Sequence, residues 1–191
     1  MTPALIVVSG PPGSGKTTLA HQIARAVGCP AVCRDEIKEG MVHATPGFTA
    51  SVGDDLTTRT LPVFFEVIGL LLKAGVTSVA EAAFQDPVWR PRLTPFLTVA
   101  RVRIVHCVVD PEVAFGRILR RSADNGARRA HDDPGAADRA VVLRRLREFN
   151  PVSLGVPSIE VDTTSGYHPG IAEIAAFAGQ PLGGQPFSGQ P

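Results

Sequence analysis

The sequence is poor in cysteine and has no long apolar run. Among 191 residues there are three cysteines, and Cys29 and Cys33 have no histidines at zinc-finger spacing around them. We therefore expect reduced thiols in the cytoplasm, without a disulfide framework or a zinc-finger-type metal site. No stretch approaches the ~20 apolar residues of a membrane-spanning helix. The N-terminus leads directly into an apolar run, so we also expect no signal peptide and no membrane partner.

Excess charge of one sign is also lacking. The chain has 19 Lys and Arg against 18 Asp and Glu, a formal net charge of +1. Such a chain has no overall attraction for nucleic acid or anionic membranes. Lysine itself is scarce, at three residues, and nine of the sixteen arginines lie between Arg117 and Arg147. The position of these arginines is thus more informative than their number.

Short apolar runs alternate with helical patterns along most of the chain. Strand-like runs occupy 4–9, 30–33, 76–80, 102–109 and 158–161. Helical patterns occupy 16–27, 35–42, a stretch around 63–72 that Pro62 kinks or restarts, 87–97, 112–122, 138–149 and 169–178. The alternation predicts an α/β fold, a three-layer αβα sandwich with a five-stranded parallel sheet.

The expected domain covers residues 1–178. Within it, the polar segment at about 122–137 is predicted to be a lid that carries arginines. Residues 179–191 repeat Gly, Gln and Pro without an apolar pattern, which predicts a disordered tail.

The most specific motif lies between the first strand and the first helix. Its nine residues read GPPGSGKTT and match the phosphate-binding pattern G-x-x-x-x-G-K-[ST]. Glycines let backbone N–H groups converge on phosphate oxygens, and the helix N-terminus adds partial positive charge. Lys16 would reach the β- and γ-phosphates, and the Thr17 hydroxyl would bind Mg²⁺. The predicted nucleotide contacts are Gly10, Pro12, Gly13, Ser14, Gly15, Lys16, Thr17 and Thr18.

An acid follows the second strand in the run Arg34-Asp35-Glu36-Ile37-Lys38. Ligands of open parallel sheets bind at the carboxyl ends of strands, beside the phosphate loop. Asp35 can there accept a proton from an attacking hydroxyl, with Lys38 as a further acceptor contact. The alternative is that Asp35 only caps the following helix.

A second acid, Glu81, ends the third strand and is expected to hold a metal-bound water or a substrate hydroxyl. Its alternative is a structural pair with an arginine. The acceptor wall is expected in the loop and helix at 43–65, with aromatic residues as candidate contacts or, alternatively, as core: Phe48, Phe64, Phe84 and Trp89.

Arginines on the helix after the fourth strand can clamp a triphosphate. Arg117 and Arg121 lie one turn apart and share a face. With Arg128 in the polar segment beyond, they would neutralise charge in the transition state. The alternative is a solvated basic face. Thr163, after the last strand, lies on a loop that could reach the adenine or have no such role.

These features together resemble the small P-loop kinases of the predicted-kinase, AAA-type ATP-binding group, which is related to the kinase domain of polynucleotide 5′-hydroxyl kinase. Chloramphenicol phosphotransferase and the zeta-toxin kinases are more distant relatives. The resemblance covers about residues 3–161 and rests on four segments: GPPGSGKTT, RDEIK, the strand end at 79–84, and Val109-Asp110-Pro111 leading to Arg117 and Arg121.

The resemblance implies a nucleoside-monophosphate-kinase-like fold, with ATP and Mg²⁺ as cofactors. It implies Asp35 as general base, Lys16 and Thr17 at ATP·Mg²⁺, and an arginine of the 117–121 helix at the transferring phosphate. Arg128, Arg129 and His131 are similar to the family's lid segment. Polynucleotide kinases tend to have a polar substrate-binding residue where this chain has Ala82 and Ala83, and this departure disfavours a nucleic-acid acceptor.

The leading hypothesis is an ATP-dependent kinase that phosphorylates a hydroxyl of a nucleoside, sugar, antibiotic or other metabolite, as a monomer or homodimer. A second is a polynucleotide 5′-hydroxyl kinase, whose binding would weaken steeply with salt. A third is a regulatory module that binds ATP without catalysis. A fourth is a toxin kinase controlled by an antitoxin.

Overall fold

A single parallel sheet organises the computed structural model of the chain, which describes residues 2–51, 53–124 and 139–179. The strands have the order β2-β3-β1-β4-β5, and each pairs with its neighbours in parallel. Their bounds are β1 (Ala4–Ser9), β2 (Ala31–Cys33), β3 (Ser78–Glu81), β4 (Arg101–Val108) and β5 (Ser158–Asp162). The predicted α/β class with a five-stranded parallel sheet is confirmed.

The central strand explains why the sheet lies between two helical layers. All six residues of β1 are buried, so the strand has no solvent-facing side. One face packs on α3 (Asp55–Lys73) and α4 (Asp86–Leu93), which is followed by the 3₁₀ helix η1 (Thr94–Thr98). The opposite face packs on α1 (Lys16–Val27) and α7 (Ile171–Gly179). The three-layer arrangement is therefore the predicted one.

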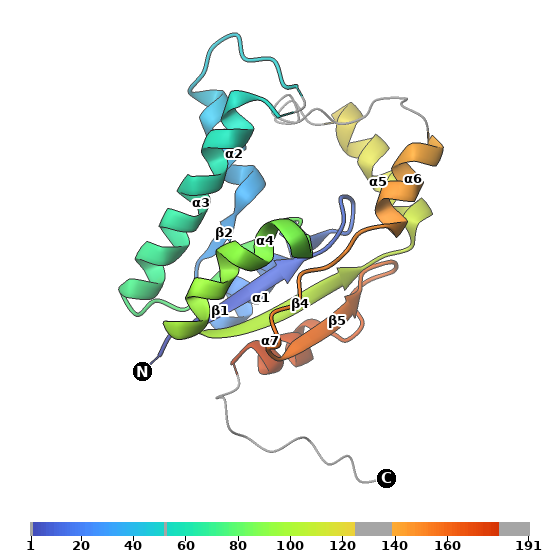
Figure 1. Cartoon of the computed structure of the whole chain (residues 1–191). Helices are drawn as coiled ribbons and strands as arrows, with labels where there is room; N and C mark the ends of the chain where they lie inside the picture. Colours follow the sequence, from blue (N-terminus) through green and yellow to red (C-terminus); the bar gives the residue numbers. More distant parts are fainter. Residues whose placement is uncertain (1, 52, 125–138, 180–191) are drawn as a thin grey trace, which may run out of the picture.

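Three further helices lie beyond the carboxyl ends of the strands. Helix α2 (Arg34–His43) follows β2, while α5 (Pro111–Asp124) and α6 (Arg139–Arg147) share a small apolar cluster of their own. Figure 1 shows α2 and the start of α3 on one side of this edge and α5 and α6 on the other. The loop after β1 lies between the two groups.

The predicted bounds of helices and strands agree best with the observed ones where the local sequence pattern is most regular. The strand at 4–9 and the helix at 16–27 have the predicted bounds. Helix α3 begins at Asp55, earlier than its apolar stripe indicated, and Pro62 lies inside it without ending it. Within the described residues, no helix is both long and apolar enough to cross a bilayer.

Two predictions fall on residues outside the described part of the chain. Most of the lid at 122–137 and nearly all of the tail at 179–191 belong to the ranges 125–138 and 180–191. The domain limits of 1–178 and the arginine-bearing lid thus stay predictions.

A buried ion pair connects α2 to the start of α3. Lys38 Nζ lies 2.7 Å from Asp54 Oδ2, and their side chains are only 4% and 5% exposed. Asp54 is also the N-cap of α3, where its other carboxylate oxygen accepts the Thr57 N–H at 2.7 Å. Burial alone would raise the pKa of Asp54, but the hydrogen bonds from Lys38 and Thr57 lower it to about 2. One carboxylate therefore starts α3 and holds α2 against it.

Replacing Asp54 by Asn should separate these two roles. The amide oxygen can still cap α3, but Lys38 would be left as a buried cation without its counter-charge, a loss of about 3 kcal/mol in the free energy of unfolding at pH 7. The Asp54 pKa is lower in the folded chain than its ordinary 3.8, so the wild-type advantage is complete above pH 4 and declines as the pH falls toward 2.

Urea denaturation of both proteins between pH 7 and pH 3 measures this difference. Asp55→Asn is the matched control, because the Asp55–Arg59 pair is exposed and should contribute less than about 1 kcal/mol. A deficit for Asp54→Asn that stays constant with pH would contradict the role given to the carboxylate charge.

Candidate active site

The loop between β1 and α1 has the backbone shape that a phosphate site requires. Gly13 and Gly15 have φ angles of 76° and 73°, a left-handed conformation that L side chains rarely adopt. A Cβ on Gly13 would also lie 2.4 Å from the carbonyl oxygen of Ala114 in α5. Gly15 is the N-cap of α1, and neither a capping side chain nor an acid occupies the first turn. The N–H groups at this helix start are thus available to an anion.

Groups from distant parts of the chain hold the carbonyls of this loop. The Thr163 hydroxyl, just after β5, donates to the Ser14 carbonyl at 2.7 Å. The Arg117 guanidinium on α5 donates to the Gly13 carbonyl at 3.4 Å and to the Thr163 carbonyl at 2.7 Å. Both residues therefore fix the loop from the side of β5 and α5.

The sequence patterns did not indicate these contacts of Thr163 and Arg117. Thr163 was expected either on a loop that reaches the adenine or on one without such a role; its side chain is buried, and its hydroxyl faces the phosphate loop. Arg117 was expected at the transferring phosphate, and its guanidinium is half-buried against backbone carbonyls. In this conformation both side chains contact backbone carbonyls of the loop or next to it, and their roles at the nucleotide stay predictions.

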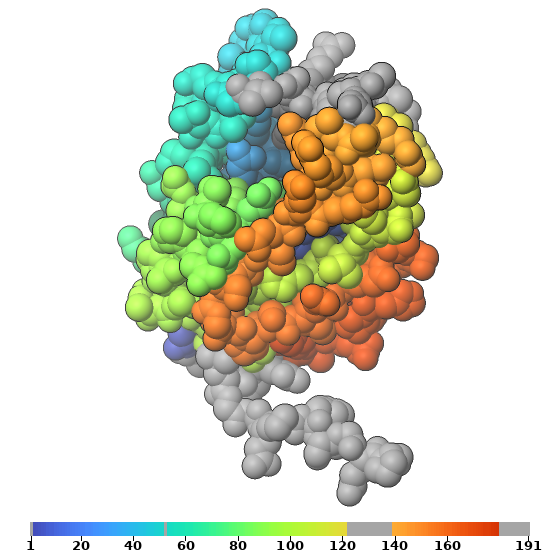
Figure 2. Space-filling view, turned by 45° about the vertical axis from the view of Figure 1, so that its right-hand side comes forward, coloured from blue at the N-terminus to red at the C-terminus, as the bar shows by residue number. Residues whose placement is uncertain are grey.

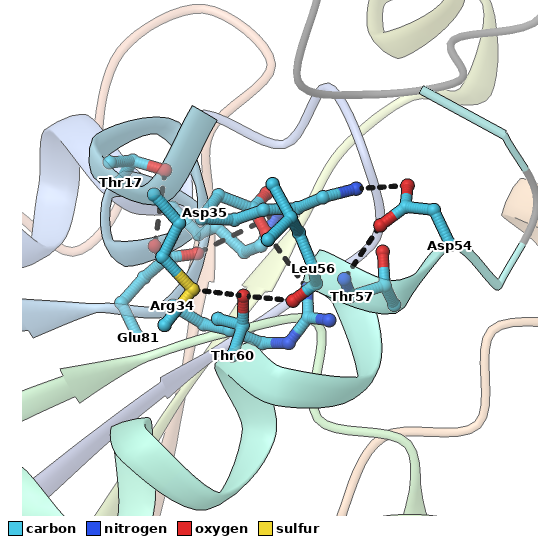
Figure 3. Close-up of polar contacts among 11 residues, drawn as sticks. Thr17, Arg34, Asp35, Asp54, Leu56, Thr57, Thr60 and Glu81 are labelled. Carbon is cyan, nitrogen blue, oxygen red and sulfur yellow. Dashed lines mark hydrogen bonds and ion pairs between the residues drawn. The ribbon is translucent and has the colours of Figure 1, made fainter. Parts of the chain in front are cut away.

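Glu81, at the end of β3, lies directly beside the loop. Its Oε2 accepts a hydrogen bond from the Thr17 hydroxyl at 3.2 Å, and its Oε1 lies 3.7 Å from Lys16 Nζ. Figure 3 shows Glu81 and Thr17 facing each other close to Asp35. Burial raises the pKa of Glu81, the charge of Lys16 lowers it, and the charge of Asp35 raises it. Two elements, α1 and β3, thus bring a cation, a hydroxyl and an acid to one point.

The residues at this point fit a magnesium–triphosphate group. Within the described residues, Ser14 Oγ and Glu81 Oε1 are buried without a hydrogen-bond partner. Buried polar atoms without partners are rare in native proteins and need a ligand or water. A hydroxyl and a carboxylate oxygen are also ligands that Mg²⁺ prefers. Thr17 and Glu81 could hold the metal, and the glycine loop the phosphates.

Asp35 lies in the first turn of α2, next to this group. The N-cap of α2 is Cys33, so Asp35 does not cap the helix. Arg34 Nη1 donates to Asp35 Oδ1 at 3.1 Å, and the Asp35 side chain is 42% exposed (Figure 3). Figure 3 shows the Asp35 side chain close to Glu81 and Thr17. The carboxylate is thus both close to the phosphate loop and accessible from outside.

Several residues expected at the acceptor occupy other positions. Lys38 was expected to bind it, but its ammonium group is buried against Asp54. Phe84, Phe64 and Trp89 form one aromatic cluster in the core, with centroids of Phe84 and Trp89 4.8 Å apart. Because Phe84 is fully buried, it cannot touch an acceptor in this conformation.

Of the remaining predicted contacts, Phe48 and Arg121 lie within the described residues, and those of the lid do not. The half-buried Phe48 lies near Lys38, with the ammonium 5.8 Å from its ring centroid, so it is the aromatic candidate nearest the surface. Arg121 lies partly exposed in the last part of α5. Arg128, Arg129 and His131 are outside the described residues.

A cavity of about 150 Å³ lies on the other side of the phosphate loop, near α6. Its walls include Gly10, His106, Leu146 and Glu160. Figure 2 shows a hollow beside the segment that contains α6, with the start of the chain visible in its depth. Pockets for nucleotide-sized ligands are usually 300 Å³ or larger, so this cavity is too small for a whole nucleotide.

Comparison with protein families gives a match to the family described as "AAA domain" over residues 5–152. Curated relatives include three uncharacterized mycobacterial proteins, one from Mycobacterium bovis and two from strains of Mycobacterium tuberculosis. Each is 28% identical over 134 residues, which is 65% of this chain and 27% of the relative. The chain therefore matches about a quarter of the length of these relatives.

Solved structures with the same fold include several kinases. A candidate kinase from Chloroflexus aurantiacus is 28% identical, with a TM-score of 0.77 over 93% of this chain and 97% of that chain. A sugar kinase from Janibacter has 22% identity and a TM-score of 0.61, over 92% and 94% of the two chains. A chain of the Pnkp1/Rnl/Hen1 RNA repair complex has 17% identity and a TM-score of 0.55, over 79% and 48%. The last two show the likeness of fold alone.

Thr163→Val tests how the phosphate loop is held. Valine has nearly the same shape but no hydroxyl, so the buried Ser14 carbonyl would lose its donor, at a cost of about 1–3 kcal/mol. We expect ATP to bind about tenfold more weakly and the melting temperature to fall. Calorimetric titration and thermal unfolding measure both effects.

Thr163→Ser keeps the hydroxyl and is the matched control, with binding expected close to wild type. Wild-type ATP affinity in Thr163→Val would show that this hydrogen bond does not shape the nucleotide site.

Proposed function

This chain belongs to the AAA domain family, and we propose that it is an ATP-dependent phosphotransferase that moves the γ-phosphate of ATP to a hydroxyl group of a small molecule. One observation supports this most strongly. Lys16 and Thr17 at the end of the phosphate loop contact Glu81, and the accessible carboxylate of Asp35 lies close to them (Figure 3). A donor site and a candidate base are therefore adjacent.

On the donor side, the glycine loop and the start of α1 would bind the triphosphate. Lys16 lies 3.7 Å from Glu81 and could turn to the β- and γ-phosphate oxygens when they arrive. Thr17 and Glu81 would hold Mg²⁺, which when bound neutralises charge on the phosphates. Arg117 would keep the loop in shape from behind. These residues orient the phosphorus atom for attack from the side of Asp35.

On the acceptor side, we propose Asp35 as the general base. Its half-exposed carboxylate can accept the proton of an acceptor hydroxyl while that oxygen attacks the γ-phosphorus. Arg34 donates to Asp35 Oδ1 at 3.1 Å, and this hydrogen bond helps to fix the direction of the side chain. Such positioning, together with charge stabilisation, accounts for most of catalysis in phosphoryl transfer.

The charges around Asp35 support an acceptor without a phosphate or carboxylate of its own. The two cations closest to Asp35 in sequence are Arg34 and Lys38, and each has an acidic partner. An anionic acceptor would have to compete with Asp35 and Asp54 for them. We therefore propose an uncharged polyhydroxy compound such as a sugar or nucleoside. The sugar kinase with the same fold is consistent with this class.

A polynucleotide 5′-hydroxyl kinase is the second candidate, because a chain of an RNA repair complex shares the fold. The net charge of +1 and the paired state of Lys38 disfavour it, since backbone phosphates are bound by available Lys and Arg. We further propose that Arg121, with Arg128 in the segment beyond α5, neutralises charge on the transferring phosphate.

Asp35→Asn tests the proposed base. The amide has nearly the same size but cannot take the proton, so turnover should fall by roughly 10²–10⁴-fold. ATP affinity should change little, because Asp35 does not belong to the phosphate loop. Steady-state kinetics and ATP titration measure the two quantities. Glu39→Gln, one turn along α2, is the control and should retain turnover. Unchanged turnover in Asp35→Asn would remove this residue from the mechanism.

An acceptor screen tests the proposed substrate class. ATP consumption would be followed with separate pools of neutral sugars, nucleosides, aminoglycosides, sugar phosphates and short oligonucleotides. We expect turnover above background in a neutral pool, with little dependence on salt. Turnover only with oligonucleotides, together with a steep loss at higher salt, would instead favour the polynucleotide kinase.

A further inference from the structure

Three potential metal ligands meet where α1, β2 and α2 come together. They are His21 on α1, Cys33 at the end of β2, and Glu36 in the first turn of α2. One ligand atom from each, a ring nitrogen, a sulfur and a carboxylate oxygen, lies within 4.8 Å of the others. The sequence did not indicate this cluster, because its three residues come from separate elements. Cys29, which is closer to His21 in sequence than Cys33 is, does not belong to it.

From this geometry we propose that His21, Cys33 and Glu36 form a binding site for a divalent zinc ion. Zinc takes nitrogen at about 2.0 Å and sulfur at about 2.3 Å in a tetrahedron, so such ligands stand roughly 3.5 Å apart. His21 Nε2 and Cys33 Sγ are 3.7 Å apart. His21 Nε2 and Glu36 Oε1 are hydrogen-bonded at 2.6 Å, and this pair must open by about 1 Å to admit the ion.

The chemistry of the three ligands selects the kind of metal. A thiolate and an imidazole are ligands of zinc and related transition metals, whereas Mg²⁺ and Ca²⁺ prefer oxygen. On binding, the Cys33 thiol loses its proton to solvent, and the sulfur, the imidazole nitrogen and the carboxylate oxygen each form a bond to the ion. The side chains of His21 and Glu36 are 48% and 45% exposed, whereas Cys33 is buried, so the ion would approach from the side of His21 and Glu36 and could keep a water there as its fourth ligand.

The position of this site connects it to the proposed reaction. Cys33 and Glu36 lie on either side of Arg34 and Asp35 in sequence, and His21 lies one helical turn after Thr17 on α1. A bound ion would thus join α1 to the segment that includes Asp35. Any effect on phosphate transfer rests on the proposed function, whereas metal binding itself does not.

The experiment measures binding directly on the full chain after removal of metals with a chelator. Cobalt(II) is the spectroscopic probe, and zinc is then added to displace it. We expect one cobalt per chain with an absorption band for thiolate-to-cobalt charge transfer, and loss of this band when one equivalent of zinc is added. Binding of cobalt without a thiolate band, or no binding at all, would overturn the proposal.

Single variants assign the ligands. His21→Ala and Cys33→Ala should each weaken zinc binding by at least about 100-fold, since even changes outside the ligand set weaken metal sites by 10- to 100-fold. Cys29→Ala is the matched control and should bind zinc like wild type. Because the His21 side chain is exposed, His21→Ala should disturb folding least, and its melting temperature checks that the variant is folded. Zinc affinity that is unchanged in either ligand variant would contradict the site.

Discussion

The structure depends on a backbone constraint at the end of β1. The chain must reverse within a few residues so that the N–H groups at the start of α1 can meet an anion. Gly13 permits this reversal because it has no Cβ: a Cβ there would collide with the Ala114 carbonyl, and the φ angle of Gly13 is left-handed. Thr163 and Arg117 then hold the loop carbonyls from β5 and α5. The parallel sheet places all these elements at one edge, so fold and phosphate loop are parts of one arrangement.

Two ion pairs between acids and lysines lie near the carboxyl ends of the strands. Lys16 lies against Glu81, and Lys38 lies against Asp54. Glu81 is buried, and its carboxylate is therefore stable only with the ammonium of Lys16 or a metal ion close by. If an arriving triphosphate draws Lys16 away, Glu81 must take up either a proton or another cation. In the proposed function, Mg²⁺ is that cation, which explains why donor and metal would bind together.

The sequence predicted those parts of the molecule that local patterns determine. The bounds of β1 and α1, the parallel sheet and the phosphate loop follow from apolar runs, glycines and periodicity. Contacts between residues far apart in the chain could not be predicted from local patterns. The Thr163–Ser14 hydrogen bond, for example, joins residues 149 positions apart. The aromatic residues near the acceptor segment were ambiguous for the same reason, because Phe84 could line a pocket or, as found, the core. Asp54 was missed, although an acid just before a helix is a common N-cap.

The central claim is that backbone amides of the loop bind the triphosphate of ATP. Amide NMR spectra of ¹⁵N-labelled protein, titrated with Mg²⁺ and a non-hydrolysable ATP analogue, test it most directly. The account predicts that the resonances of Gly13, Gly15 and Lys16 shift strongly and saturate together, while those of exposed residues on α6 do not move. Saturable binding that leaves these three amides unchanged would contradict it.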